Sequence, residues 1–115
     1  MHSAYALALL LVAATLGTLP VRAFANGDDP AVDIRLQDGR FDPSEVRVPA
    51  GRPFTLRVTS TEKDAVEFES FELHRERVIQ PGGTITVLMP ALAPGTYKFF
   101  DDFHPDTPEG TIVAK

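Results

Sequence analysis

Carboxylates and histidines gather in two short windows of the sequence. The two windows hold ten of the 16 acidic residues, namely Glu62, Asp64, Glu67, Glu69, Glu72 and Glu76 in the first and Asp101, Asp102, Asp106 and Glu109 in the second. His74 lies in the first window and His104 in the second. Like charges at this density repel one another unless water solvates them or a cation is shared. Oxygen and imidazole donors together suit iron, Cu(II), manganese or zinc. The pattern therefore indicates a metal site of hard ligands, with a solvated acidic surface as the alternative.

The overall composition narrows this chemistry further. The 115 residues include no cysteine, and 11 Lys and Arg stand against 16 Asp and Glu, which gives a formal net charge of −5. Without cysteine the chain forms no disulfide, thiolate zinc site, iron–sulfur cluster or thiol nucleophile. An acidic chain also lacks the cationic surface that nucleic acids and anionic membranes require. The sequence has no G-x-S-x-G motif, which disfavours a hydrolase.

The first 25 residues differ from the rest of the chain. They contain no Asp or Glu and one basic residue, Arg22, and residues 6–16 are almost entirely small or apolar. This stretch is shorter than the ~20 residues that span a bilayer, and it precedes an A-x-A pattern at residues 23–25. We predict a cleaved secretory signal peptide over residues 1–25, a flexible tail over 26–30 and one domain over 31–115. Because the basic segment is weak, an uncleaved anchor is the alternative.

The remainder of the chain predicts β-strands. Apolar residues alternate with polar ones over 32–36, 46–48, 54–58, 66–69, 85–89, 97–99 and 111–113. Gly- and Pro-rich turns separate these runs, for example at 38–39, 49–51 and 81–83. Many short strands with frequent turns are typical of an all-β, Greek-key sandwich or barrel. Residues 70–80 do not alternate strictly, so we predict a loop or single turn there.

Strand alternation also places one carboxylate on the core face. Asp101 shares its face with Tyr97 and Phe99. A carboxylate at the end of a buried row is costly unless it is paired or coordinated. His104 follows three residues later. We therefore expect Asp101, Asp102 and His104 to point into one pocket at an end of the barrel.

Residues 93–104, APGTYKFFDDFH, followed by GTIV at 110–113, resemble the C-terminal metal-binding hairpin of cupredoxins. Residues 41–51 resemble the opening motif of that family, and residues 67–73 with 78–82 resemble its EfeO-type subgroup. The most similar members are the small FtrB-like periplasmic cupredoxins of ferrous-iron uptake systems. The resemblance implies a periplasmic location for the exported chain, a cupredoxin-like fold, iron or non-blue copper and no organic cofactor. It also implies a membrane iron permease and a periplasmic iron-binding partner, and it suggests ferroxidase activity without fixing it.

The sequence departs from the family pattern at the metal ligands. Asp101 stands where a blue-copper protein has its cysteine, and His104 matches the C-terminal histidine. Glu109 falls near the position of the axial methionine, and Glu67 stands near that of the first histidine. A copper–thiolate site is therefore excluded, and hard oxygen donors with one nitrogen favour iron or non-blue Cu(II).

The predicted metal ligands are Glu67, Glu69, Asp101, Asp102, His104 and Glu109. Plain solvent exposure is the alternative for Glu67 and Glu69, a turn cap or a group behind the ligands for Asp102, and a turn flank for Glu109. His74 is predicted as an exposed loop residue, with ligation as its alternative. Three functions stay open: an iron-acquisition cupredoxin, a non-redox metal carrier, and a partner-binding sandwich without metal.

Overall fold

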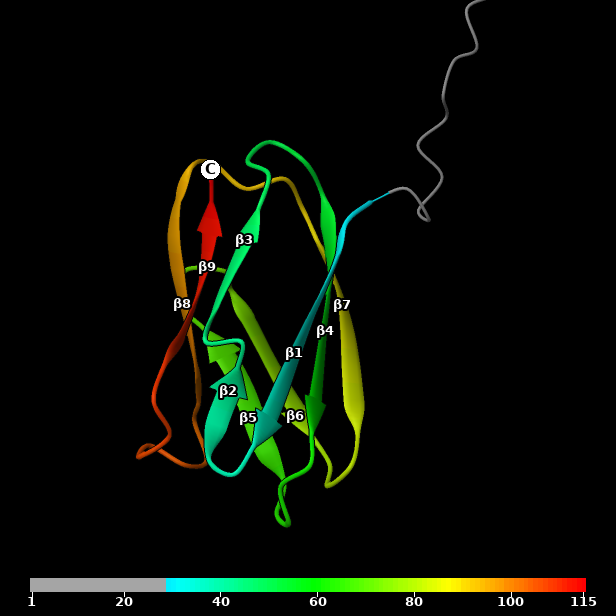
Figure 1. The fold of residues 1–115 in the computed structure, drawn as a ribbon, viewed down its shortest axis with the longest axis vertical. Coiled ribbons are helices and arrows are strands. Elements are labelled where there is room, and N and C mark those ends of the chain that lie inside the picture. Colours follow the sequence, from blue (N-terminus) through cyan, green and yellow to red (C-terminus); the bar gives the residue numbers. More distant parts are fainter. Residues whose placement is uncertain (1–28) are drawn as a thin grey trace, which may run out of the picture.

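The computed structural model describes residues 29–115, so the predicted signal peptide and residues 26–28 of the predicted tail lie outside the described part. The strands are β1 (Ala31–Gln37), β2 (Arg40–Asp42), β3 (Glu45–Val48), β4 (Phe54–Ser60), β5 (Val66–Ser70), β6 (Arg75–Ile79), β7 (Thr84–Met89), β8 (Gly95–Asp101) and β9 (Gly110–Ala114) (Figure 1). Residues 29–115 contain no helix that could cross a membrane.

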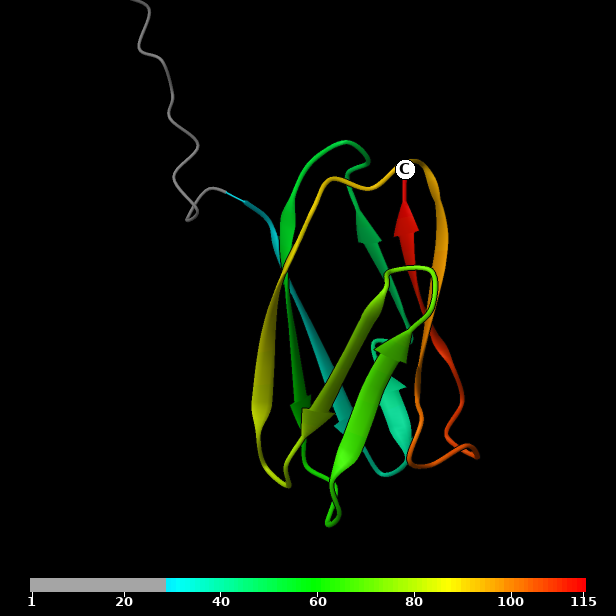
Figure 2. The same cartoon turned by 180° about the vertical axis from the view of Figure 1, so that it is seen from behind.

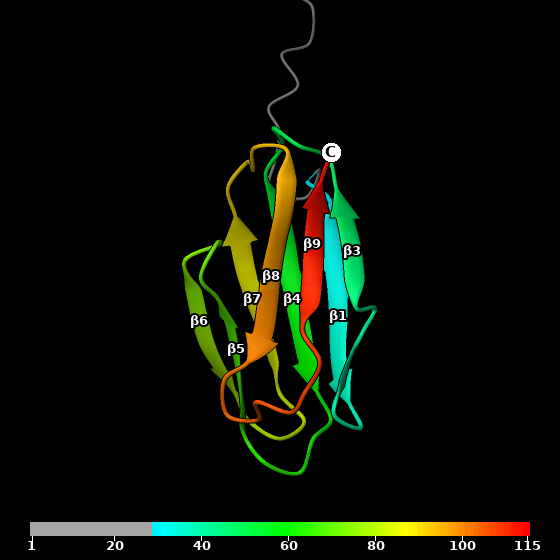
Figure 3. The ribbon, with the colours of Figure 1, turned by 90° about the vertical axis from the view of Figure 1, so that its left-hand side faces the viewer.

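The strands form two mixed sheets that pack face to face. The first sheet has the order β2-β1-β4-β7 and the second the order β3-β9-β8-β5-β6 (Figure 3). β1 pairs with β4 and β3 with β9 in parallel, and the other neighbours are antiparallel. The prediction of an all-β sandwich is confirmed.

An aromatic cluster fills the core beneath β8. Phe99 is fully buried, and its ring lies 4.9 Å from that of Phe41, edge to face, and 5.3 Å from that of Phe68. Gly110 lies opposite Phe99 in the β8–β9 register, and a Cβ atom there would lie 2.2 Å from the Phe99 ring. The ring therefore packs directly over the glycine backbone, and no larger residue fits without moving it.

The structure corrects one prediction and adds a short strand. The expected loop or single turn over 70–80 is wrong, because β6 occupies Arg75–Ile79 and pairs with β5. β6 lies at the edge of its sheet and most of its residues are exposed, so it carries no apolar alternation. The turn is limited to residues 71–74 and ends at His74, which has a φ of 53° and an exposed side chain. β2, with three residues, was too short to be predicted.

Candidate metal-binding site

The structure divides the predicted ligands between the two faces of the second sheet. Along β5, Val66 and Phe68 enter the core, so Glu67 and Glu69 point to the outer face. Asp101 lies opposite Phe68 and is buried on the inner side. Asp102, the next residue, is exposed, and its N–H donates to the Glu67 carbonyl at 3.0 Å. Asp101 and Asp102 are adjacent in the sequence but lie on opposite sides of the sheet.

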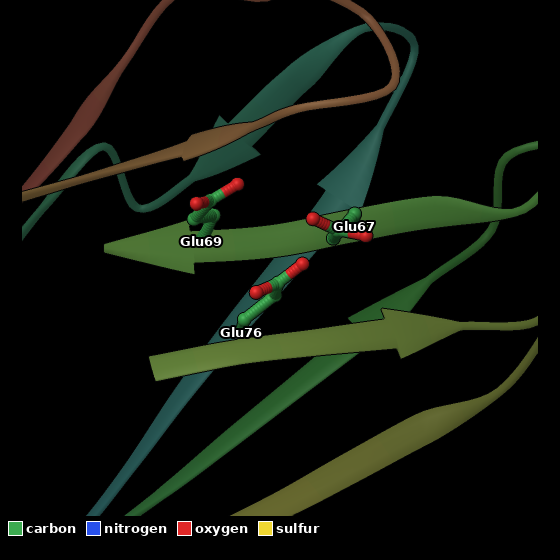
Figure 4. Close-up of side chains that lie close together, drawn as sticks. All are labelled: Glu67, Glu69 and Glu76. Carbon is green, nitrogen blue, oxygen red and sulfur yellow. The ribbon is translucent and has the colours of Figure 1, made fainter. Parts of the chain in front are cut away.

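Three glutamates meet on the outer face. One carboxylate oxygen from each of Glu67, Glu69 and Glu76 lies within 4.8 Å of the others (Figure 4). Glu69 and Glu76 are directly opposite each other in the β5–β6 register. Glu67 is only 7% exposed, Glu69 is half-buried and Glu76 is exposed. Glu76 was absent from the predicted ligands because its strand was predicted as irregular chain.

The four neighbouring carboxylates, Glu67, Glu69, Glu76 and Asp102, are called here the outer carboxylate cluster. Burial raises the pKa of Glu67 to about 7, and the hydrogen bond and negative charge of Glu76 add to this shift, as do the charges of Asp102 and Glu69. Burial, followed by the charges of Asp102 and Glu76, also raises the pKa of Glu69. Each raised pKa means that the charged form of the carboxyl group is unfavourable at this place.

Among residues 29–115, none of the ion pairs given below links a basic side chain to the outer carboxylate cluster. The ion pairs within residues 29–115 are Arg47–Glu45, Arg57–Asp33 and His104–Asp101, and none involves a cluster member. The cluster therefore holds negative charge that a bound cation would stabilise. Carboxylate oxygens are the donors that hard cations prefer.

Asp101 lies beneath the cluster and is 2% exposed. Its Oδ1 accepts hydrogen bonds from the N–H of Glu67 at 3.0 Å and the N–H of Phe103 at 3.1 Å. Its Oδ2 lies 2.7 Å from Nδ1 of His104. The protein itself thus satisfies this carboxylate, and a cation on Oδ2 would have to displace His104.

His104 faces a different region from the outer carboxylate cluster. Its side chain is 42% exposed and lines a surface pocket of about 710 Å³ together with Glu62, Asp64 and Asp106 (Figure 2 shows the loop that carries it, in orange). Because Nδ1 bonds to Asp101, Nε2 is the ring nitrogen available to other groups.

Glu109 belongs to neither group. It lines another pocket, of about 810 Å³, with Phe41, Asp42 and Ser44. The structure thus brings Asp101 and His104 together, and it brings Glu67, Glu69 and Asp102 together with Glu76. The expected single pocket containing Asp101, Asp102 and His104 is divided, because Asp102 lies against Glu67 instead.

Solved structures with the same fold include copper proteins. Auracyanin A, a "blue" copper protein from Chloroflexus aurantiacus, aligns with a TM-score of 0.62 and 17% identity over 74% of this chain and 98% of its own. The metal-binding domain of the Cu(I)-exporting P-type ATPase CopA of Streptococcus pneumoniae D39 aligns with a TM-score of 0.63 and 13% identity, over 74% of this chain and 84% of its own. Amicyanin from Paracoccus versutus gives a TM-score of 0.59 at 19% identity, over 79% and 89%. Since this chain has no cysteine, the blue-copper ligand set does not fit it.

Two comparisons at the level of sequence assign the family. The uncharacterised protein RP394 of Rickettsia prowazekii (strain Madrid E) is 36% identical over 96 residues, which cover 78% of this chain and 77% of that protein. Residues 4–114 match the family model described as a cupredoxin-like domain. The chain therefore belongs to the cupredoxin-like domain family.

Proposed function

We propose that this protein is a periplasmic metal-binding cupredoxin of ferrous-iron acquisition that binds iron at the outer carboxylate cluster. The observation that supports this most is the meeting of three glutamate oxygens within 4.8 Å. The ligands are Glu67, Glu69 and Asp102 from the predicted set, together with Glu76. Two further parts complete the proposal. Export through residues 1–25 rests on the composition of that segment. Delivery to a membrane iron permease and docking to a periplasmic iron-binding partner rest on the sequence resemblance.

The donor set favours iron over the softer Cu(I). All four side chains offer anionic oxygen, and the chain has no thiolate to offer. Concentrated carboxylate charge stabilises Fe(III) more than Fe(II), because the electrostatic attraction grows with the charge of the ion. A bound Fe(II) would therefore be easier to oxidise than the aqueous ion. Copper bound by these oxygen donors would be non-blue.

A non-redox iron carrier is the second candidate, and one observation favours it. Within residues 29–115, the three glutamates are the only group of three or more His, Cys, Asp or Glu side chains whose ligand atoms all lie within 4.8 Å of one another. A single-ion site has no neighbouring redox metal to accept the electron that Fe(II) oxidation releases. The carrier binds iron stoichiometrically without accelerating its oxidation.

One titration tests the proposal. The protein lacking residues 1–25 is titrated with Fe(II) under anaerobic conditions in a calorimeter, and oxygen is then admitted while the remaining Fe(II) is measured. We expect one Fe(II) per chain, with faster oxidation for a ferroxidase and an unchanged rate for a carrier. Absence of binding would overturn both candidates. Asp33→Asn, an acid removed from the other sheet, is the matched control and should bind like the unaltered protein.

A further inference from the structure

We propose that Asp101 is a positioning residue that sets the distance between Glu67 and Asp102 in the outer carboxylate cluster. This inference rests on the proposed function, because it concerns the same cation site. Asp101 itself points to the inner side of the sheet, where it is 2% exposed. Its effect on the outer side is carried by the backbone.

The hydrogen bonds of the Asp101 carboxylate involve the backbone of both segments that carry the ligands Glu67 and Asp102. Oδ1 accepts the N–H of Glu67 at 3.0 Å and the N–H of Phe103, the residue after Asp102, at 3.1 Å. The N–H of Asp102 in turn donates to the carbonyl of Glu67 at 3.0 Å. The backbone of Glu67 is therefore bound at its N–H and at its C=O by the segment 101–103. Two ligand-bearing residues that are far apart in the sequence are fixed side by side.

The strand pairing makes this connection necessary. β5 and β8 are in register only at Phe68↔Asp101 and Glu69↔Phe100. β8 ends at Asp101, where the chain turns with a bond from the His104 N–H to the Asp101 carbonyl at 3.2 Å. Beyond this point the β5–β8 ladder has no further pair, and the Asp101 side chain continues the connection between the two strands. The bond to an N–H two residues ahead is the usual one of an Asx-turn.

His104 completes the arrangement from the other side of the carboxylate. Its Nδ1 lies 2.7 Å from Oδ2, which fixes the rotation of the carboxylate and leaves Oδ1 directed at the two backbone N–H groups. All three hydrogen-bond donors to the Asp101 carboxylate belong to the protein itself. As a direct metal ligand, the same carboxylate would have to release at least one of them.

Two substitutions separate positioning from ligation. Asparagine at position 101 keeps an Oδ1 that accepts both N–H groups, and its amide donates to Nδ1 of His104 in the other tautomer. Alanine removes every one of these bonds. A positioning role therefore predicts that Asp101→Asn preserves cation binding and Asp101→Ala loses it. Direct ligation predicts a loss in both variants, because an amide is a poor substitute for an anionic ligand.

The experiment uses Mn²⁺, an air-stable hard divalent cation, titrated by calorimetry into the protein lacking residues 1–25. We expect Asp101→Ala to bind about 10- to 100-fold more weakly, as is usual when a residue supporting the ligands is lost. Asp101→Asn should stay within about threefold of the unaltered protein. Asp106→Asn, an exposed acid on the same loop, is the matched control and should leave the affinity unchanged.

Hydrogen exchange of the Glu67 and Asp102 amides provides a readout that does not depend on the cation. Both amides should exchange faster in Asp101→Ala and at the normal rate in Asp101→Asn. Unaltered Mn²⁺ affinity or unaltered exchange in Asp101→Ala would overturn the positioning role alone. An equal loss of affinity in both variants would identify Asp101 as a ligand and overturn it as well. Lack of Mn²⁺ binding by the unaltered protein would overturn the proposed function together with this inference. Should Asp101→Ala fail to fold, Asp101→Asn still decides between the two roles.

Discussion

Acidic residues on the outer faces of the two sheets differ in the charge of their cross-strand partners. On the first sheet, Asp33 of β1 lies opposite Arg57 of β4, with Nε–Oδ1 and Nη2–Oδ2 distances of 2.7 and 3.0 Å. The hydrogen bond from Arg57 lowers the pKa of Asp33. On the second sheet, Glu69 lies opposite Glu76, and the pKa of Glu69 is raised. The first face pairs its acid with an arginine, whereas the second places two acids opposite each other.

Strand register produces this difference. Arg75 and Arg77 flank Glu76 in β6, and alternation turns both toward the side of the sheet opposite Glu76. A shift of one residue in the β5–β6 pairing would place an arginine beside Glu69 and remove the cluster. Opposite charges across strands stabilise a sheet, and like charges directly opposite destabilise it. The basic residues are therefore present in the strand but are excluded from the site.

The largest expected effect comes from making the second face resemble the first. Glu76→Arg places a guanidinium opposite Glu69, as Arg57 lies opposite Asp33. We expect the affinity for Mn²⁺ or Fe(II) to fall on the order of 100-fold, because the charge of the ligand set governs affinity for hard cations. Calorimetry measures this change. Glu45→Arg, an equal change of charge on β3 of the same sheet, should retain binding, and a similar loss there would attribute the effect to net charge alone.

Cation binding should also raise the melting temperature of the unaltered protein. A ligand present at 100 times its dissociation constant stabilises the folded state by about 2.7 kcal/mol. For a domain of this size that corresponds to a rise of roughly 10 to 20 °C. Thermal unfolding with and without Mn²⁺ checks this, and Glu76→Arg should show no rise. A melting temperature that does not respond to Mn²⁺ in the unaltered protein would contradict the site.

The pH dependence of the metal-free protein should have opposite signs on the two faces. The pKa of Glu67 is about 7 in the folded protein and 4.5 ordinarily, so between these values the folded state holds more protons than the unfolded state. Its contribution to the free energy of unfolding is therefore present below about pH 4.5 and is lost as the pH rises through about 7. Asp33, whose pKa is lowered, contributes above its ordinary pKa of 3.8 and loses this contribution as the pH falls.

Urea unfolding of the metal-free protein at several values between pH 5 and pH 8 measures the first of these effects. We expect the midpoint to fall toward pH 8 in the unaltered protein and to change less in Glu67→Gln, whose amide does not ionise. A midpoint that rises toward pH 8 in the unaltered protein would contradict the raised pKa of Glu67.

The smallest expected effect is on the first sheet. Asp33→Asn removes the pair with Arg57, but exposed ion pairs contribute little to stability, so the melting temperature should change by no more than about 2 °C. Cation affinity should not change. A large fall in melting temperature in this variant would show that the Asp33–Arg57 pair contributes more to stability than an exposed ion pair usually does.

Most of the fold could be predicted because alternation is strong wherever a strand covers the core. β4 and β7 alternate almost perfectly between buried and less buried residues. β6 could not be predicted, because an edge strand with exposed residues has no apolar pattern to detect. The burial of Asp101 followed from its place after Tyr97 and Phe99, and the structure confirms it.

The candidate site was less predictable than the fold. Glu67 and Glu69 were found as an outward pair, but Glu76 reaches them only through the pairing of β5 with β6, which local sequence does not show. The separation of Asp101 from Asp102 depends on which hydrogen bonds the turn forms, and several turn geometries suit the same residues. The site therefore depends on contacts between strands that are distant in the sequence, whereas most strands could be predicted from local patterns.

β6 also has a consequence for how this protein behaves at high concentration. An edge strand with unpaired backbone groups can add a strand from another molecule and start aggregation, and charged residues on the edge oppose this. Arg75, Glu76 and Arg77 place three consecutive charges on β6. When a cation takes up the negative charge of Glu76, the two arginines remain, so the edges of two loaded molecules repel each other. Loading of the proposed site would therefore leave the exposed edge protected against self-association by strand addition.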